Sequence, residues 1–151
     1  MTIKAYGAHA GDRPLEPLDI TRRTPGAHDV QIDIAYCGVC HSDLHQARGD
    51  WGGEIFPMVP GHEIVGHVSA VGGAGTKYKV GDAVGVGCFV DSCRACPQCR
   101  AGEEQFCSGG MTLTYNGRER DTGAPTYGGY STRIVVDQDY VLRIPGGMPL
   151  D

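Results

Sequence analysis

The stretch at residues 29–45 reads DVQIDIAYCGVCHSDLH, and it decides how the fold is interpreted. Its first half places an apolar residue at every second position, the period-two pattern of a strand with one buried face. Its second half brings cysteine and histidine directly to the end of that strand. The stretch therefore predicts a half-buried strand that leads into metal-ligating residues. A short helix should follow, capped by Ser42 or Asp43 and ending near Arg48.

Further strand patterns lie on both sides of this stretch. Glycine accounts for 24 of the 151 residues and is scattered between valine-rich segments, as expected for tight turns between short strands. No G-x-G-x-x-G sequence lies between a strand and a helix, so no dinucleotide site is visible. We expect a mainly β fold with short helices, arranged as an antiparallel barrel or sandwich. The other expected strands are residues 2–6, 64–71, 130–136 and 140–144, and residues 80–86 are expected to form a turn followed by a strand.

Charge and composition narrow the function classes. The length suits one domain, and the net charge of -5 argues against a nucleic-acid partner recruited by bulk charge. No basic patch indicates a membrane surface, and no signal peptide or apolar run of transmembrane length is evident. We therefore expect a cytoplasmic protein. In a reducing compartment, seven cysteines indicate metal binding or catalysis rather than disulfides.

Four of these cysteines form a tight cluster with the spacing C-x2-C-x2-C-x7-C. Four thiolates suit a closed tetrahedral Zn²⁺ site, which can organise a loop that has no core of its own. We expect Arg94 and Arg100 to offset part of the negative charge. The predicted structural zinc ligands are Cys93, Cys96, Cys99 and Cys107.

Three alternatives to zinc fit the cluster less well. The ferredoxin pattern for an iron–sulfur cluster places the fourth cysteine after three residues and before a proline, whereas here the gap is seven residues without a following proline. Disulfides are disfavoured by the compartment and by the crowded spacing. Four unrelated buried cysteines are improbable at this density.

A second group of ligand-type residues is separate in sequence. Cys40 follows the end of one predicted strand, and residues 61–63, Gly-His-Glu, precede another. If they converge, they form an incomplete ligand set that leaves a position open for water or substrate, as catalytic zinc requires. The alternative is a structural His62 and a Cys40 that is simply a small buried residue. Cys37 is expected to be a packed free thiol.

The chain resembles the N-terminal, GroES-like catalytic domain of zinc-dependent medium-chain alcohol dehydrogenases, and within them the cinnamyl-alcohol-dehydrogenase-like branch. The matching segments occur in the family's order along the whole chain. The resemblance implies a partly open GroES-like β-barrel with a zinc-binding loop over residues 1–151. The segments are CGVCHSDLH at 37–45, PGHE at 60–63, VGD at 80–82, the four-cysteine loop, and GGY at 128–130.

The resemblance also implies roles for individual residues. It makes Cys40 and His62 ligands of a catalytic zinc, with Glu63 as a neighbouring carboxylate that can approach the metal. It makes Ser42 the hydroxyl that receives the alcohol proton and His45 the relay that passes the proton towards solvent.

Other positions follow from the same resemblance. Asp43 corresponds to the carboxylate that orients the ligand histidine. His41 occupies the place where the family contacts the cofactor pyrophosphate. Trp51 is expected in the substrate pocket, together with Cys88 and Met111.

The function implied is a zinc-dependent, NAD- or NADP-linked dehydrogenase of primary, including aromatic, alcohols, working as an aldehyde reductase in reverse. We expect the cofactor-binding Rossmann domain and a third zinc ligand to lie beyond residue 151, so that the isolated chain is inactive and holds about one zinc tightly. A homodimer or tetramer is expected at full length. The alternatives are a non-catalytic zinc-stabilised barrel module and an iron–sulfur electron-transfer module.

Overall fold

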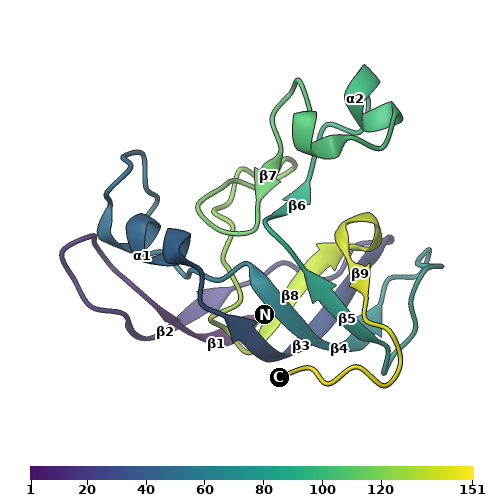
Figure 1. Ribbon diagram of the computed structural model, residues 1–151, viewed down its shortest axis with the longest axis horizontal. Helices are drawn as coiled ribbons and strands as arrows, with labels where there is room; N and C mark the ends of the chain where they lie inside the picture. Colours follow the sequence, from purple (N-terminus) through teal and green to yellow (C-terminus); the bar gives the residue numbers. More distant parts are fainter.

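The computed structural model describes residues 1–151 and is mainly β, with short helices at the edges (Figure 1). The largest sheet has five antiparallel strands in the order β8-β3-β4-β5-β9. Long β3 and β4 lie at its centre and pair along most of their length. The strands of this sheet are β3 (Asp29–Gly38), β4 (Glu63–Val71), β5 (Ala83–Val86), β8 (Arg133–Asp137) and β9 (Leu142–Arg143).

The core lies on one face of this sheet, where the alternating apolar residues of its strands meet. Val30 and Ile32 of β3 are fully buried, as the period-two pattern predicts. Burying each such side chain contributes roughly 1.5–3 kcal/mol. The sheet is therefore a rigid base for the residues at its edge. The nine buried members of the core are Val30, Ile32, Ile64, Val68, Val84, Val86, Ile134, Val136 and Val141.

A separate hairpin, β1 (Thr2–Gly7) with β2 (Glu16–Thr21), packs Ile3 and Ile20 against Val59 in a second, smaller core. Isolated bridges from Ala5 to Ser131 and from Ala8 to Met58 join it to the remaining chain. The two sheets do not close into a continuous ring. The barrel is thus partly open, and the fold class expected from the sequence is confirmed.

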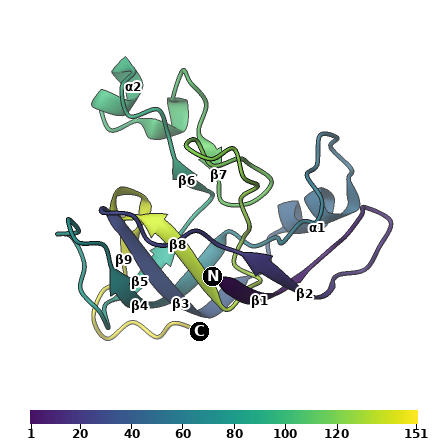
Figure 2. The ribbon, with the colours of Figure 1, turned by 180° about the vertical axis from the view of Figure 1, so that it is seen from behind.

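The four-cysteine segment forms a lobe that projects from the sheet, and both views show it standing clear of the barrel (Figures 1 and 2). A short ribbon leads into and out of this lobe. It consists of β6 (Phe89–Asp91) and β7 (Thr112–Leu113), which pair in antiparallel fashion. Inside the lobe are helix α2 (Pro97–Arg100) and the 3-10 turn η1 (Glu104–Phe106).

Several local expectations need correction. Helix α1 spans His41–Arg48, so Cys40 is its N-cap rather than Ser42 or Asp43. Asp43 sits in the first turn and accepts a hydrogen bond from the Cys40 amide, 3.0 Å away. The strand expected at 130–136 begins only at Arg133, because the preceding segment bonds to β1 and to the loop at Pro60.

The last expected strand, 140–144, is reduced to the two residues of β9. It is preceded by the 3-10 turn η2 (Gln138–Tyr140), in which the Asp137 carboxylate accepts from the Asp139 amide at 2.9 Å. Sequence reasoning missed β2, β6, β7 and both turns of helix in the lobe. No helix has the length and apolar character needed to cross a membrane.

Candidate metal centres and active site

The lobe brings its four cysteine sulfurs together although little apolar packing surrounds them. All four Sγ atoms lie within 4.8 Å of one another, a spread that suits a single tetrahedral ion. Helix α2 helps to form the cluster, since Cys96 caps it by accepting a hydrogen bond from the Cys99 amide at 3.5 Å. The donors therefore fit zinc by both type and arrangement.

Hydrogen bonds to sulfur lower the pKa of these thiols, while burial raises it. Backbone amides, first that of Cys99, lower the pKa of Cys96 to about 5. The Ser92 hydroxyl, 3.2 Å from the Cys99 sulfur, acts in the same direction on Cys99, but burial and neighbouring thiols outweigh it and raise the pKa of Cys99 to about 11. Four thiolates cannot all be charged at this separation without a cation, so the cluster calls for a metal.

Arg94 differs from expectation, whereas the role expected for Arg100 stays a prediction. Arg94 turns away from the sulfurs and pairs with Asp91 and Asp137, each at 2.9 Å. Its backbone has a φ of 58°, in the left-handed region. Arg94 thus fastens the lobe to β6 and β8 instead of offsetting thiolate charge.

The second centre lies where the amino end of α1 meets the start of β4. Ligand atoms of Cys40, His62 and Glu63 lie within 4.8 Å of one another. Cys40 and His62 are half-buried, while Glu63 is exposed. The structure therefore brings together the three residues that the sequence predicts to be ligands, and their thiolate, imidazole and carboxylate donors fit zinc with an open position.

Asp43 holds the two loops of this centre together. Its side chain is 2% exposed, and its Oδ2 accepts hydrogen bonds from the Cys40 amide and the Tyr130 hydroxyl, both at 3.0 Å. Its Oδ1 accepts from the Gly61 amide at 3.1 Å. The predicted partner, His62 Nδ1, is 3.9 Å from Oδ1, which is longer than a hydrogen bond. Asp43 positions backbone around the centre more directly than it holds the imidazole.

Two glycines lie in close approaches at the same place, and Gly61 is required there. Gly61 has a φ of 103°, and a Cβ there would lie 2.7 Å from the Cys37 sulfur and 2.8 Å from the Tyr130 ring. A Cβ on Gly38 would lie within 2.2 Å of a Glu63 carboxylate oxygen. A side chain at Gly61 would push the ligand-bearing loops apart, whereas one at Gly38 would displace the exposed Glu63 carboxylate. Cys37 itself is a half-buried free thiol whose pKa is raised by burial to about 11.

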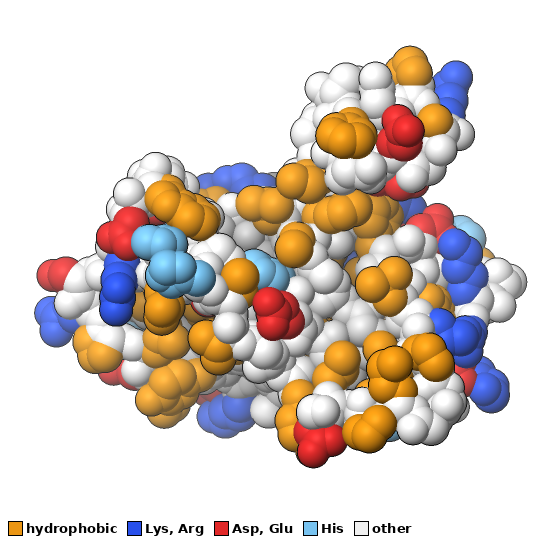
Figure 3. Space-filling view, in the orientation of Figure 1, with side chains coloured by type: hydrophobic (Ala, Val, Ile, Leu, Met, Phe, Trp, Pro, Cys, Tyr) orange, Lys and Arg blue, Asp and Glu red, His pale blue; other side chains and the backbone are white.

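The predicted proton-transfer residues occupy α1 and the loop after it. The Ser42 hydroxyl donates to the Cys40 sulfur at 3.2 Å. His45 Nδ1 lies 2.8 Å from Asp50 Oδ2, and its ring stacks on Trp51 with centroids 5.1 Å apart. In Figure 3 one group of histidine side chains lies on the face over α1.

The remaining predicted residues lie near this face to differing degrees. The His41 ring centroid is 4.5 Å from that of His45. Trp51 is 58% exposed and Met111 42% exposed, and Cys88 is an exposed thiol. The structure links Trp51 to the cluster through His45, whereas Cys88 and Met111 stay predictions.

Sequence reasoning missed Tyr115, which contacts this centre, and Asp50, which contacts the predicted relay residue His45. Tyr115 is buried and stacks on His62 with centroids 5.7 Å apart and an interplanar angle of 13°. Asp50 was also not singled out. Tyr115 gave no local signal, because its importance depends on a contact with a distant segment, whereas Asp50 could have been noticed as a carboxylate five positions after His45.

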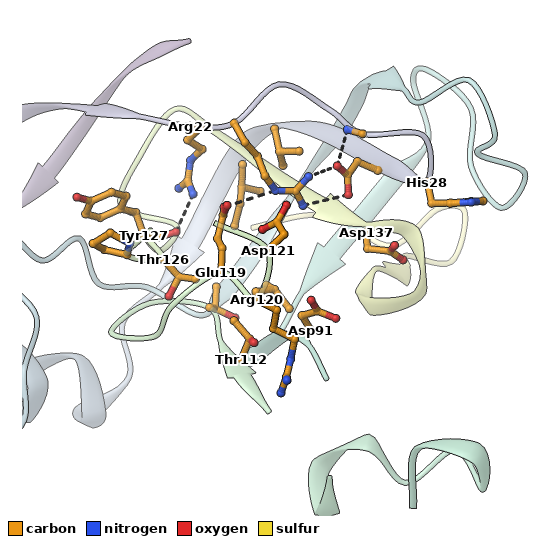
Figure 4. A pocket seen from close by; sticks show the side chains of 18 of the residues that line it. Arg22, His28, Asp91, Thr112, Glu119, Arg120, Asp121, Thr126, Tyr127 and Asp137 are labelled. Atoms are coloured by element: carbon orange, nitrogen blue, oxygen red, sulfur yellow. Dashed lines mark hydrogen bonds and ion pairs between the residues drawn. The ribbon is translucent and has the colours of Figure 1, made fainter. Parts of the chain in front are cut away.

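A cavity of about 370 Å³ lies elsewhere, between the barrel and the lobe, and contains none of the predicted active-site residues. Figure 4 shows basic and acidic side chains mixed in its lining, among them Arg22, Glu119 and Asp121. Arg23 pairs with Asp29 and Glu119. Half-buried Arg22 donates to the carbonyl of Tyr127 at 2.8 Å. Because Arg23 is ion-paired and Arg22 bonds backbone carbonyls, we interpret this cavity as part of the attachment of the lobe.

The fold and the two donor clusters define a metal-binding β domain of the GroES-like class. Residues 26–146 match the model of the Alcohol dehydrogenase GroES-like domain. The chain therefore belongs to this family.

Similar proteins agree with this assignment. The chain is 58% identical to NADP-dependent alcohol dehydrogenase C 1 of Mycolicibacterium smegmatis, over 99% of the chain and 43% of that protein. It is 60% identical to the aldehyde reductase YahK of Escherichia coli, over 95% of the chain and 41% of that protein. It superposes on the cinnamyl alcohol dehydrogenase of Sorghum bicolor with a TM-score of 0.97 and 45% identity, covering 100% of this chain and 43% of that one. The chain thus spans less than half the length of these relatives.

Proposed function

We propose that residues 1–151 form the catalytic domain of a zinc-dependent, NADP-linked alcohol dehydrogenase, which also reduces aldehydes and acts on primary, including aromatic, alcohols. The observation that carries this proposal is the convergence of Cys40, His62 and Glu63 within 4.8 Å, beside the hydroxyl of Ser42. Relatives named as NADP-dependent alcohol dehydrogenase and aldehyde reductase support the reaction class and the choice of NADP.

In this proposal Cys40 and His62 hold the metal, and the Glu63 carboxylate can approach it. When bound, zinc supplies Lewis acidity towards an alcohol or carbonyl oxygen, and the nicotinamide supplies the two-electron redox chemistry. Ser42 Oγ accepts the proton of the substrate hydroxyl, and His45 passes it to solvent. Because Asp50 occupies Nδ1 of His45, the other ring nitrogen is left for this transfer.

Surrounding residues complete the proposed site. His41, at the exposed amino end of α1, contacts the cofactor pyrophosphate, which a helix amino terminus favours electrostatically. Trp51 lines the substrate pocket. Cys93, Cys96, Cys99 and Cys107 hold a structural zinc that takes no part in the reaction.

The test is an assay of the full-length protein with NADP or NAD and with cinnamyl, benzyl and short aliphatic alcohols. We expect NADP-dependent turnover that Cys40→Ser abolishes while the lobe keeps its zinc. Turnover that survives in Cys40→Ser, or no oxidation of any primary alcohol by a protein that holds both metals, would contradict the proposal. A visible absorption band of an iron–sulfur cluster in the purified protein would also contradict it, since Zn²⁺ is colourless.

A further inference from the structure

The chain returns from the four-cysteine lobe to the barrel through residues 114–117, which we call the strap. The strap is anchored at both ends. Thr114, 1% exposed, donates through its hydroxyl to the Gly87 carbonyl at 2.5 Å. The Gly117 amide donates to the Thr126 hydroxyl at 2.9 Å. The residues between these anchors therefore have little freedom to move.

Tyr115 lies in the middle of the strap and meets the candidate metal centre. Its ring is 5% exposed and nearly parallel to that of His62, with an interplanar angle of 13° and a centroid distance of 5.7 Å. Burial, and then the neighbouring Asp43 carboxylate, raise the pKa of Tyr115, while the Ser42 hydroxyl acts in the opposite direction. Its phenol thus lies beside two residues of the helix turn that follows Cys40.

Asn116 locks this arrangement against helix α1. Its backbone has a φ of 54°, an uncommon conformation for a residue other than glycine. Its side chain accepts from the Ile55 amide at 2.8 Å and donates to the side-chain carbonyl of Gln46 at 2.5 Å. The strap is therefore held to the helix that carries Ser42 and His45, and Tyr115 cannot turn away from His62.

The ring of His62 lacks the support that a ligand histidine normally has. Such a histidine usually donates its second ring N–H to a carboxylate or carbonyl, which fixes the plane of the ring. Here the carboxylate of Asp43 is 3.9 Å from His62 Nδ1, beyond hydrogen-bonding distance. The stacked Tyr115 ring is the contact that fixes this plane.

We propose that Tyr115 is a positioning residue for the Cys40–His62 metal centre, and that through it the strap couples the order of the four-cysteine lobe to metal binding at that centre. This inference rests on the proposed metal centre. A stacked aromatic ring holds the imidazole plane without competing for its nitrogens. The lobe then has a function beyond its own stability, because its exit segment orients a ligand of the second site.

The test uses the full-length protein with its lobe filled by zinc and the second centre titrated with Co²⁺. Thiolate-to-cobalt absorption reports binding at Cys40. Tyr115→Leu removes the stacked ring and should weaken Co²⁺ binding by about 10–100-fold, the range seen when an outer partner of a metal ligand is lost. Tyr115→Phe keeps the stack and should bind within about three-fold of the wild type, since ring stacking needs no hydroxyl.

Val136→Ala is the matched control for a general loss of stability. It opens space at a residue that is 1% exposed and belongs to the core of the five-stranded sheet, a cluster that does not include the strap. We expect it to lower the unfolding midpoint while leaving Co²⁺ affinity unchanged.

The outcomes separate the two proposals. If the wild type shows no thiolate-to-cobalt absorption outside the lobe, the proposed metal centre itself is wrong. If the wild type binds and Tyr115→Leu binds equally well, only the role of Tyr115 is overturned. If Tyr115→Leu and Val136→Ala lost equal Co²⁺ affinity, the role of Tyr115 would also be overturned, because the loss would then reflect global stability.

Discussion

The two donor clusters of this protein are built in opposite ways. The lobe takes all four ligands from one short segment, Cys93 to Cys107, whose surroundings offer almost no apolar packing. The Cys40–His62 centre takes its ligands from two segments that the central sheet holds side by side. The lobe therefore needs its metal to fold, whereas the second centre is positioned by the folded sheet before a metal binds.

This difference has a physical consequence for binding. A local cluster gains folding free energy from its ion, so metal loss and unfolding of the lobe are one event. A cluster built on a folded sheet keeps its arrangement without the ion, and its affinity depends on how well neighbours fix each ligand. Variants that remove single ligands or neighbours test this contrast.

The largest effect is expected from Cys107→Ser, which removes one of four lobe ligands. The lobe should lose its tightly held zinc, and amides of residues 93–110 should exchange freely while those of β3 and β4 stay protected. Metal analysis and hydrogen exchange by mass spectrometry measure this. Cys88→Ser, at an exposed thiol outside both clusters, is the control and should change neither. If amides of residues 93–110 stayed protected from exchange without zinc, the lobe would not depend on its metal for folding, and the comparison of the two clusters would fail.

His62→Ala is expected to act only at the second centre. Co²⁺ affinity there should fall by more than about 100-fold, since even an outer partner of a ligand is worth about 10–100-fold. The unfolding transition and the lobe zinc should be unchanged because the sheet does not need this ion. His67→Ala, at an exposed histidine on the same strand, is the control and should bind Co²⁺ normally. If the lobe lost zinc in His62→Ala, the second centre would affect metal binding in the lobe, contrary to this expectation.

Asp43→Asn tests how the sheet preorganises the second centre. The buried carboxylate accepts from Cys40, Gly61 and Tyr130, and an amide would turn a donor towards at least one of these donors. We expect the free energy of unfolding in urea to fall by about 2–3 kcal/mol, the cost of a buried group left unsatisfied. Asp12→Asn, at an exposed site, should have no effect. An unchanged stability would mean that Asp43 does not join the two loops.

The smallest effect is expected from Arg94→Gln. This change removes the ion pairs to Asp91 and Asp137 that hold the lobe against the barrel. Because the side chain is partly exposed, the loss should be only about 1 kcal/mol and should shrink further in high salt. Arg100→Gln, on α2 and without an ion pair, is the matched control. Equal effects of the two changes would indicate a general charge effect on the thiolates.

The sequence predicts the lobe cluster more firmly than the Cys40–His62 centre, because the lobe takes its ligands from one segment and the second centre takes them from two. Spacing alone identifies the lobe, because its ligands are close along the chain. The spacing of Cys40 and His62 supports only the hypothesis that they share a metal. The family resemblance makes them specific candidates for catalytic zinc ligands. The alternation of apolar and polar residues at 29–36 predicts a strand of the sheet that joins them. It does not predict which residues of β3 and β4 pair.

What escaped prediction depends on tertiary contacts. Strand β2 contains Pro17 and buries only Ile20, so it has no clear alternating pattern. Tyr115 and Asn116 lie in a segment without periodicity, and only the folded chain shows them against His62 and α1. The pairing of Arg94 with Asp137 likewise links positions that no local rule connects.

Of the seven cysteines, Cys88 alone is exposed, whereas Cys37 is packed against the core with a raised pKa. An alkylating reagent therefore has a single open target while both ions are in place. Release of the ion at the second centre would add Cys40 as a target, and collapse of the lobe would add four more. The mass of the labelled chain would then record, molecule by molecule, which of the two ions was present.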